Sequence, residues 1–258
     1  MFMSDTEVNI RGQAALRRTQ MVKHIPDLDP RDVPTYTCAD VARYLGLPSS
    51  TVRAWALGTQ YSSGGKKRRF EPVIERPDRE SNLLSFTNLI EVHVLSAIRR
   101  THRVPLQKVR EILRFIDEQF PTPHPLARLE WSTDQMDLFV EILGKIFSVK
   151  GSTGQIEIRK VVQAYLSRIE RDEYGLAMRF YPFTRAEHAD RPIADQPKTV
   201  VIDPRISFGA PVLIGTGIPT AVLAARFKAG ESMRALAKDY ACRLQLIEEA
   251  IRCEQPAA

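Results

Sequence analysis

The sequence predicts a mainly α-helical protein with small β elements, an α+β chain built from more than one unit. Three observations predict this class. A helix-turn-helix pattern spans Thr35–Gly58, a glycine turn beside four consecutive cations follows it, and a short β hairpin precedes three short helices after Thr199. The 258 residues are enough for two or three domains. We expect an N-terminal arm (1–33), a winged helix-turn-helix unit (34–120), a middle α+β module (121–184), a linker (185–198) and a C-terminal unit (199–258).

The composition is that of a globular protein, with 43% hydrophobic and 26% charged residues. No apolar run approaches the ~20 residues that a membrane span needs, and the N-terminus lacks an apolar signal core. Cys38, Cys242 and Cys253 lie far apart without a CxxC spacing. This pattern predicts reduced thiols and a cytoplasmic protein, and the missing apolar run predicts no membrane association.

Positive charge is concentrated in one part of the chain. The net charge is +6, and residues 34–79 hold eight Lys or Arg against four Asp or Glu, which is +4 and leaves +2 for all other residues. A local basic excess is the electrostatic footprint of phosphate binding, although a charge run can also be only a solvated face.

The first helix of the pattern has clear boundaries. Thr37 is expected to be its N-cap, with Asp40 in the capping-box position three residues later. An apolar face then forms from Val41, Ala42 and Leu45. Gly46 is expected to end the helix.

A second helix follows the turn at Leu47-Pro48. We expect Ser49 or Ser50 to cap it and Val52, Trp55 and Ala56 to face inward, with Trp55 serving as a core anchor. Thr51, Arg53 and the serine hydroxyls then face solvent. A short polar and basic helix held across a first helix can enter a DNA major groove.

The next segment predicts a wing. Gly64-Gly65 forms a turn beside Lys66-Lys67-Arg68-Arg69, four cations placed to reach backbone phosphates. The predicted DNA-contacting residues are therefore Thr37, Arg43, Ser49, Ser50, Thr51, Arg53, Lys66, Lys67, Arg68 and Arg69.

Thr37–Trp55, the basic wing and LLSFTNLIEVHVLSAIRR (Leu83–Arg100) together resemble the N-terminal DNA-binding domain of the MerR family. The resemblance covers about residues 35–120 and implies that the second helix reads the major groove while the wing grips phosphates. The chain departs from the family in its long wing insert (58–83). The usual long dimerisation coiled coil with a small effector domain does not follow.

Helices are also expected on both sides of this unit. The arm has balanced charges and a possible helix at Gln13–Val22, which could touch DNA, touch a second subunit or be disordered. Ser85 is expected to cap one helix, and Pro105 to open the next. That helix carries a short apolar seam, either a dimer contact or packing on the preceding helix, at Leu106, Val109, Leu113, Ile116 and Phe120.

The middle module shows mixed patterns. Alternation predicts strands at Leu126–Trp131, Gln155–Arg159 and Leu176–Phe183, while Asp134–Phe147 has helical spacing. Gly151–Gly154 is expected to turn. A helix should follow the second strand, with its apolar residues at Val161, Val162, Tyr165, Leu166 and Ile169.

The C-terminal unit is predicted to be a β hairpin followed by a helix-turn-helix-like bundle. Val200–Ile202 and Phe208–Ile214 form the hairpin, and Gly215-Thr216-Gly217 is the turn after it. The first helix should bury Val222, Leu223 and Phe227. Ser232 is expected to cap the second helix, and the third should carry Leu244, Ile247 and Ile251.

This stretch resembles a small domain of formally unknown function found in antitoxins of VapBC-type toxin–antitoxin pairs. The matching residues are Val201-Ile202-Asp203-Pro204, Phe208-Gly209, Pro211-Val212, Gly215-Thr216-Gly217-Ile218-Pro219, Gly230-Glu231-Ser232, Leu236-Ala237-Lys238-Asp239-Tyr240 and Glu248-Glu249-Ala250-Ile251-Arg252. The one departure is Cys242-Arg243, where the family tends to have a polar turn.

The resemblance implies a DNA-binding antitoxin of a type II pair, which silences a PIN-like ribonuclease toxin and represses the shared promoter. Whether the C-terminal unit or the middle module contacts the toxin stays open. We expect a homodimer, because two half-sites multiply affinity.

No catalytic or metal-binding pattern is expected in this chain. There is no GxxxxGK[ST], GxGxxG or GxSxG sequence, and His24, His93, His102, His124 and His188 lack ligand spacing. We therefore expect no enzyme activity, no metal and no cofactor. The alternative function is a stand-alone MerR-like regulator whose middle module senses a ligand in a pocket lined by Trp131, Phe139, Phe147 and Tyr165. A third possibility is an RNA-binding or nuclease activity of its own.

Overall fold

A computed structural model describes residues 29–63, 65–102, 106–119, 123–128, 133–146, 152–185 and 193–255. Their helices are α2 (Cys38–Leu45), α3 (Ser49–Leu57), α4 (Phe86–His102), α5 (Leu106–Gln119), α6 (Pro125–Arg128), α7 (Thr133–Ile146), α8 (Ser152–Leu166), α9 (Thr220–Lys228), α10 (Met233–Asp239) and α11 (Leu244–Cys253). The strands are β1 (Thr59–Ser63), β2 (Lys66–Phe70), β3 (Ile169–Arg171), β4 (Ala177–Phe180), β5 (Val200–Val201) and β6 (Val212–Leu213). Consecutive strands pair antiparallel in three separate two-stranded sheets. The predicted class, mainly α with small β elements, is confirmed.

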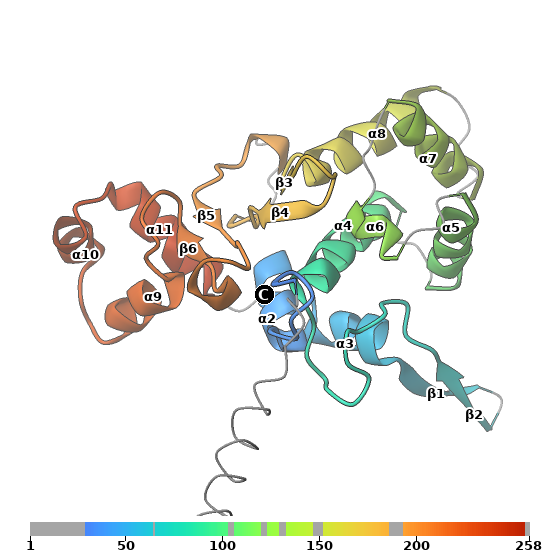
Figure 1. Ribbon diagram of the computed structural model, residues 1–258, viewed down its shortest axis with the longest axis horizontal. Coiled ribbons are helices and arrows are strands. Elements are labelled where there is room, and N and C mark those ends of the chain that lie inside the picture. The colour runs from blue at the N-terminus through green and yellow to red at the C-terminus, as the bar shows by residue number, and fades with distance from the viewer. Residues whose placement is uncertain are drawn as a thin grey trace, which may run out of the picture.

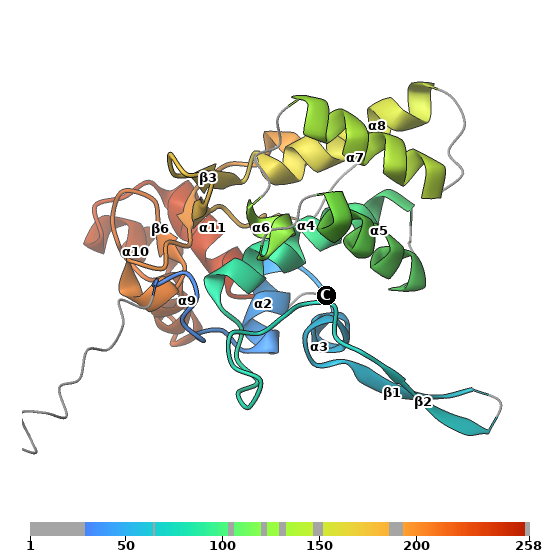
Figure 2. The same ribbon diagram turned by 45° about the vertical axis from the view of Figure 1, so that its right-hand side comes forward.

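The elements are arranged around α4 at the centre of the molecule (Figure 1). Helices α9, α10 and α11 lie on one side, and α5, α7 and α8 lie on the other. The β1–β2 hairpin extends away from the body beside α3, as Figure 2 shows from a second angle. One core of buried side chains runs through all these parts, from Tyr36 to Cys253.

The first two helices follow the sequence closely. Thr37 and Asp40 form the predicted capping box, and Gly46 closes α2 in the left-handed conformation with a φ of 61°. The predicted serine cap of α3 is wrong, because Pro48 occupies the N-cap and no side chain caps the helix. Proline fixes the φ of the N-cap residue and so starts the first turn without a capping side chain.

Helix α4 forms the centre of the core because its apolar side chains are buried on several sides. The Ser85 hydroxyl accepts a hydrogen bond from the Asn88 amide at 3.1 Å, which confirms the predicted cap, and the Asn88 carboxamide oxygen accepts from the Ser85 amide. The helix contacts α2, α5, α6, α8 and β4. Ile116, one of the seam positions of α5, is buried inside this core. Packing within the chain therefore accounts for that part of the seam, whereas the side chains of Leu106, Val109 and Phe120 lie outside the described set.

Two of the predicted strands in the middle module are wrong. The chain is helical at Pro125–Arg128, and α8 begins at Ser152, so neither the Gly151–Gly154 turn nor the Gln155–Arg159 strand forms. Ile158 and Val162 are buried on one helical face, while Ile156 is 49% exposed. The alternation of Ile156 and Ile158 was therefore coincidental. Ile169 lies in β3 rather than in the preceding helix.

A buried arginine joins the middle of the chain to the segment before the last unit. The Arg168 guanidinium is 1% exposed and donates to four backbone carbonyls, at distances of 2.7–3.0 Å. Its acceptors are the carbonyl oxygens of Tyr181, Pro182, Gln196 and Pro197. Burial lowers the pKa of Arg168 to about 10. These bonds hold together the two chain segments on either side of residues 186–192.

The three predicted helices of the C-terminal unit are present, and β5 pairs with β6 as a hairpin. The predicted strand Phe208–Ile214 is wrong at its start, because Ser207–Gly209 forms a 3-10 turn and β6 covers only Val212–Leu213. Ser232 caps α10 through the Ala235 amide, as predicted. Leu223 is buried as expected, but Val222 and Phe227 are 43% and 38% exposed. Their predicted burial is wrong, because α9 places Thr220 and Leu223 in the core and faces α11 with that side.

Candidate nucleic-acid interface

The outward face of α3 is the first part of the interface. Val52, Trp55 and Ala56 are fully buried and fix the orientation of the helix. Arg53 is consequently exposed, together with Ser49 and Ser50. None of the ion pairs among the described residues involves Arg53. Its guanidinium is therefore available to a base edge or a phosphate.

The β1–β2 hairpin, which we call the wing, is the second part. Its register pairs Ser63 with Lys66 and Ser62 with Lys67, and Gly65, just before β2, has a φ of 74°. Gly58 enters the hairpin with a φ of 76°, and a Cβ at this position would clash with the Phe70 carbonyl oxygen. A glycine is therefore required at the wing root.

The wing presents its cations to solvent. Lys67 and Arg69 are exposed and two residues apart, so strand alternation puts them on the same face. Arg69 pairs with Glu71 at 3.3 Å, and both side chains are more than 60% exposed. Such a pair contributes only about 0–1 kcal/mol, so it can be exchanged for a phosphate contact. The structure describes the backbone of Lys66 and Arg68 but not their side chains.

Two predicted contact residues already have partners inside the chain. The Thr37 hydroxyl accepts from the Asp40 amide as the helix cap. Arg43 pairs with Asp40 at 3.0 Å and with Glu254 at 3.5 Å. Contact between DNA and either side chain would require these interactions to be exchanged.

Two further arginines, on other helices, extend the basic surface. Arg99 of α4 is exposed, lies over the Trp55 ring and donates to the Thr51 hydroxyl at 3.2 Å. Arg110 of α5 stacks over Phe70 at the wing root, 4.2 Å from the ring centroid. No local sequence signal marks either arginine as part of this surface, because both positions depend on how α4 and α5 pack against the helix-turn-helix.

Comparisons with known proteins agree with this geometry. The family described as "Putative DNA-binding HTH domain" matches residues 34–113, which contain α2, α3 and the wing. The family described as "Protein of unknown function (DUF433)" matches residues 200–252. We call residues 34–113 the helix-turn-helix domain and residues 200–252 the DUF433 domain, after the models that they match.

Two proteins of Mycobacterium tuberculosis are similar over most of their length. "Putative antitoxin VapB45" is 29% identical over 235 residues, which are 85% of this chain and 93% of that protein. "Uncharacterized protein Rv2308" is 26% identical over 226 residues, 85% of this chain and 90% of that protein. The crystal structure of Rv2018 from the same organism superposes with a TM-score of 0.58 and 27% identity, covering 86% of this chain and 98% of that one.

The DUF433 domain packs directly on the helix-turn-helix domain. The Tyr36 hydroxyl donates to the Gly209 carbonyl oxygen at 2.9 Å. Glu254 accepts from the Thr220 hydroxyl and pairs with Arg43 of α2. These contacts join the two domains at Tyr36 and at α2.

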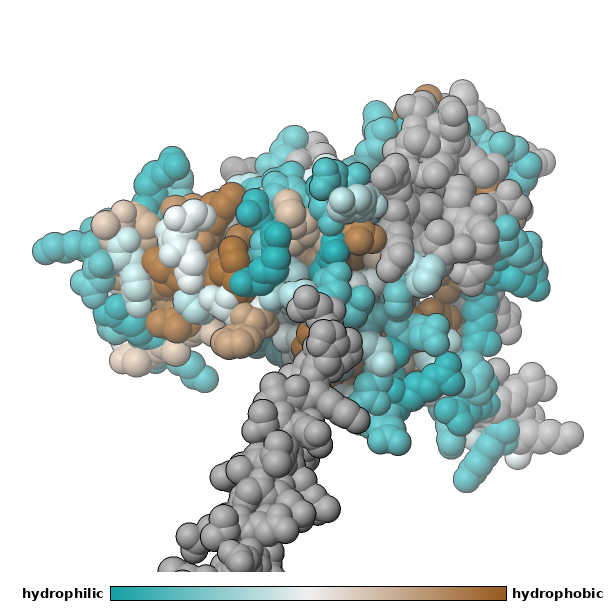
Figure 3. All heavy atoms as spheres, in the orientation of Figure 1, coloured by the Kyte–Doolittle hydropathy of each residue, from teal (hydrophilic) through white to brown (hydrophobic). Residues whose placement is uncertain are grey.

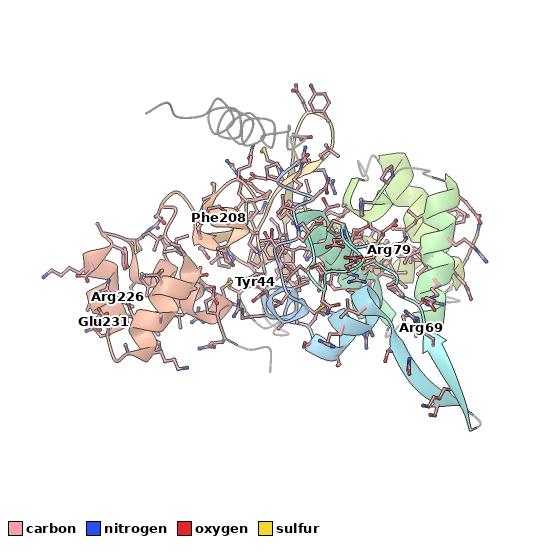
Figure 4. All side chains as sticks on the ribbon, turned by 60° about the horizontal axis from the view of Figure 1, so that its bottom comes forward. Tyr44, Arg69, Arg79, Phe208, Arg226 and Glu231 are labelled. Carbon is pink, nitrogen blue, oxygen red and sulfur yellow. The ribbon has the colours of Figure 1, made fainter. Side chains whose placement is uncertain are left out.

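A hollow of about 740 Å³ lies beside the wing root. Arg69, Arg76 and Arg79 contribute cations to its lining, and Glu71, Glu75 and Glu91 contribute carboxylates. Figure 4 labels Arg69 and Arg79. Glu91 lies 3.2 Å from His124 and is almost fully buried. The mixed charges do not select one class of ligand.

The aromatic pocket of the alternative function is largely outside the described set. Trp131 and Phe147 are not described, nor is the side chain of Phe139. Tyr165 is buried and packs on His93 and Phe183, with ring centroids 4.8 and 5.0 Å apart.

The described residues contain neither a candidate metal site nor a helix that could span a membrane. In the ranges described, no group of three or more His, Cys, Asp or Glu side chains could hold a metal ion. No helix in these ranges is long and apolar enough to cross a membrane.

Proposed function

We propose that the chain is a DNA-binding antitoxin of a type II toxin–antitoxin pair. It binds its own promoter and neutralises a PIN-like ribonuclease toxin by direct contact. The observation that carries the DNA-binding half is the exposed α3 face with Arg53, continuous with the basic wing and with Arg99 and Arg110. The similarity to a protein named as an antitoxin supports the toxin-binding half.

The basic surface accounts for promoter binding in two steps. The wing and the arginines of α4 and α5 contact phosphates and position the chain on the duplex. Arg53 and the hydroxyls at the start of α3 then reach base edges in the major groove. A homodimer would place two such surfaces on two half-sites and give an operator with two-fold symmetry.

Neutralisation requires no catalytic group in this chain. We propose a regulator that acts by binding alone, and the toxin supplies the ribonuclease activity of the pair. The stand-alone MerR-like regulator remains the alternative, and the wing-root hollow of about 740 Å³ is the feature that favours it.

Co-expression with the neighbouring open reading frame tests the proposal. The tagged chain is purified, and the complex is analysed by gel filtration and by RNA cleavage before and after the chain is removed. We expect a stable complex with a small ribonuclease that is inactive until it is released. A chain that emerges alone, as a dimer that still shifts its promoter DNA, would contradict the antitoxin function and support the stand-alone regulator.

A further inference from the structure

The loop before β6 exposes a large aromatic side chain in a strained conformation. Phe208 is 94% exposed, more than any other large apolar side chain among the described residues. Its φ of 54° and ψ of 34° are left-handed, and Ser207 before it also has a positive φ of 49°. This conformation costs about 1–2 kcal/mol for a residue with a Cβ. Burial of the side chain does not compensate for it.

The surrounding contacts hold this loop, Pro204–Gly209, in place. Asp203 at its start is 1% exposed and accepts from the Arg205 amide and guanidinium. At its other end, the Gly209 carbonyl accepts from the Tyr36 hydroxyl. A Cβ on Gly209 would clash with that hydroxyl, and the φ of 76° also requires glycine. The loop is therefore anchored at both ends, and Phe208 is displayed on a rigid support.

The residues beside Phe208 are of the kind found at the centre of protein interfaces. Ile206 is 37% exposed, and the Arg205 and Arg179 side chains are 52% and 41% exposed. Both guanidiniums are oriented by the buried Asp203 carboxylate, so the carboxylate faces inward and the cations face outward. Aromatic residues and arginines are enriched in interface cores and binding hot spots.

The surface around Phe208 also carries other exposed apolar side chains, as expected near a protein interface. Of the eight exposed large apolar side chains among the described residues, five lie between Ile206 and Phe227. Figure 3 shows hydrophobic side chains interleaved with polar ones over this end of the molecule. Figure 4 shows Phe208 on the part of the DUF433 domain that faces the centre of the chain.

We infer that the Pro204–Gly209 loop is where the toxin docks, with Phe208 entering an apolar pocket whose rim carries carboxylates for Arg205 and Arg179. This inference rests on the proposed function and places the toxin contact on the DUF433 domain rather than the middle module. The exposed cations make an acidic rim the complementary partner. A rigid loop loses little conformational entropy on binding, which strengthens the complex.

The test is a Phe208→Asn variant, because asparagine tolerates the left-handed conformation and removes only an exposed side chain. The matched control is Tyr174→Asn, which removes the 76% exposed aromatic side chain of the β3–β4 turn in the middle module. Each chain is co-expressed with the neighbouring open reading frame. Toxin affinity is measured by titration calorimetry, and the oligomeric state and promoter binding of the free chain are measured alongside.

We expect Phe208→Asn to weaken toxin binding at least tenfold and to leave folding and promoter binding unchanged, while Tyr174→Asn binds the toxin like the wild type. Unchanged toxin affinity in Phe208→Asn would overturn the inferred loop contact without contradicting the proposed antitoxin function. A loss of affinity confined to Tyr174→Asn would place the toxin contact on the middle module. If Phe208→Asn instead dissociates a dimer of the free chain, the loop contacts a second copy and the inference is wrong. Absence of any complex with the wild-type chain would contradict the proposed function itself.

Discussion

His93 is a single buried residue whose surroundings come from several distant elements of the chain. Its ring is buried among the rings of Tyr165, Phe180 and Phe183, and Nε2 donates to the Tyr165 carbonyl oxygen at 2.9 Å. Burial lowers the pKa of His93 to about 3; the hydrogen bond to Tyr165 opposes this shift, and the nearby Arg168 charge adds to it. In the sequence, His93 shows only that it lacks the spacing of a metal ligand. The structure places it at the contact between α4, α8 and β4.

This burial predicts a pH-dependent stability. His93 stays neutral in the folded chain, whereas the unfolded chain binds a proton near pH 6.5. The stability contribution is therefore complete above pH 6.5 and is lost progressively as the pH falls toward 3. Between pH 7.5 and 5.5 this one group should lower the free energy of unfolding by about 1.4 kcal/mol. Denaturant unfolding at the two pH values measures the change.

A His93→Gln variant is the control for the titration. Glutamine keeps a donor for the Tyr165 carbonyl but does not titrate. The pH dependence of its stability should be smaller than that of the wild type by the stated amount. Equal pH dependence in the two proteins would show that His93 is not the group responsible.

At the scale of elements, sequence signals succeeded where the determining contacts are local. The Thr37–Asp40 capping box, the Gly46 termination and the Ser232 cap all lie within a few residues of the helix that they bound. Gly65 of the wing is similar, because its φ of 74° is a property of its own backbone that glycine permits. These features could be predicted because each depends on neighbours along the chain.

The predictions that were wrong concern features that depend on contacts between distant parts of the chain. Gln155–Arg159 alternates like a strand, but α7 and α4 pack against this segment as a helix. The spacing of Val222 and Phe227 suggests that both are buried in a helix. In the structure α9 packs against α11 with the side that bears Leu223, and this leaves Val222 and Phe227 exposed. The parts of the site contributed by Arg99 and Arg110 were missed for the same reason. Long-range packing decides these cases, and a single sequence carries no direct record of it.

The contact between the Pro204–Gly209 loop and Tyr36, which precedes α2, can be tested with two glycines. Gly209 and Gly215 both have positive φ, at 76° and 73°, but only a Cβ on Gly209 would meet the Tyr36 hydroxyl. Gly215→Ala should cost about 1 kcal/mol from conformation alone. Gly209→Ala should cost about 1–3 kcal/mol more, because it also displaces a buried hydrogen-bonding group. Chemical denaturation measures both, and equal losses would contradict the docking of Tyr36 on this loop.

At the scale of the whole molecule, the basic surface and the Phe208 loop lie on separate parts of one continuous core. Tyr36 and Arg43 connect α2 to the DUF433 domain on one side, and α3 and the wing remain exposed on the other. The charge excess of residues 34–79 predicted the first surface from the sequence. The second could not be predicted, because the Phe208–Ile214 pattern indicates a strand and carries no signal for the left-handed conformation that exposes Phe208. Simultaneous binding of DNA and toxin is compatible with this arrangement.

The most direct test of the DNA-binding account is the salt dependence of promoter binding by a wing variant in which Lys66, Lys67, Arg68 and Arg69 are all alanine. The control variant removes the same charge from the exposed side chains of Lys228, Arg234, Lys238 and Arg243 at the opposite end of the molecule. Each lost phosphate contact should reduce the slope of log affinity against log salt by about 0.9. We predict a slope that is shallower by about 3–4 for the wing variant and unchanged for the control. A wing variant with the wild-type slope, or an equal loss in both variants, would contradict a DNA interface formed by α3 and the wing.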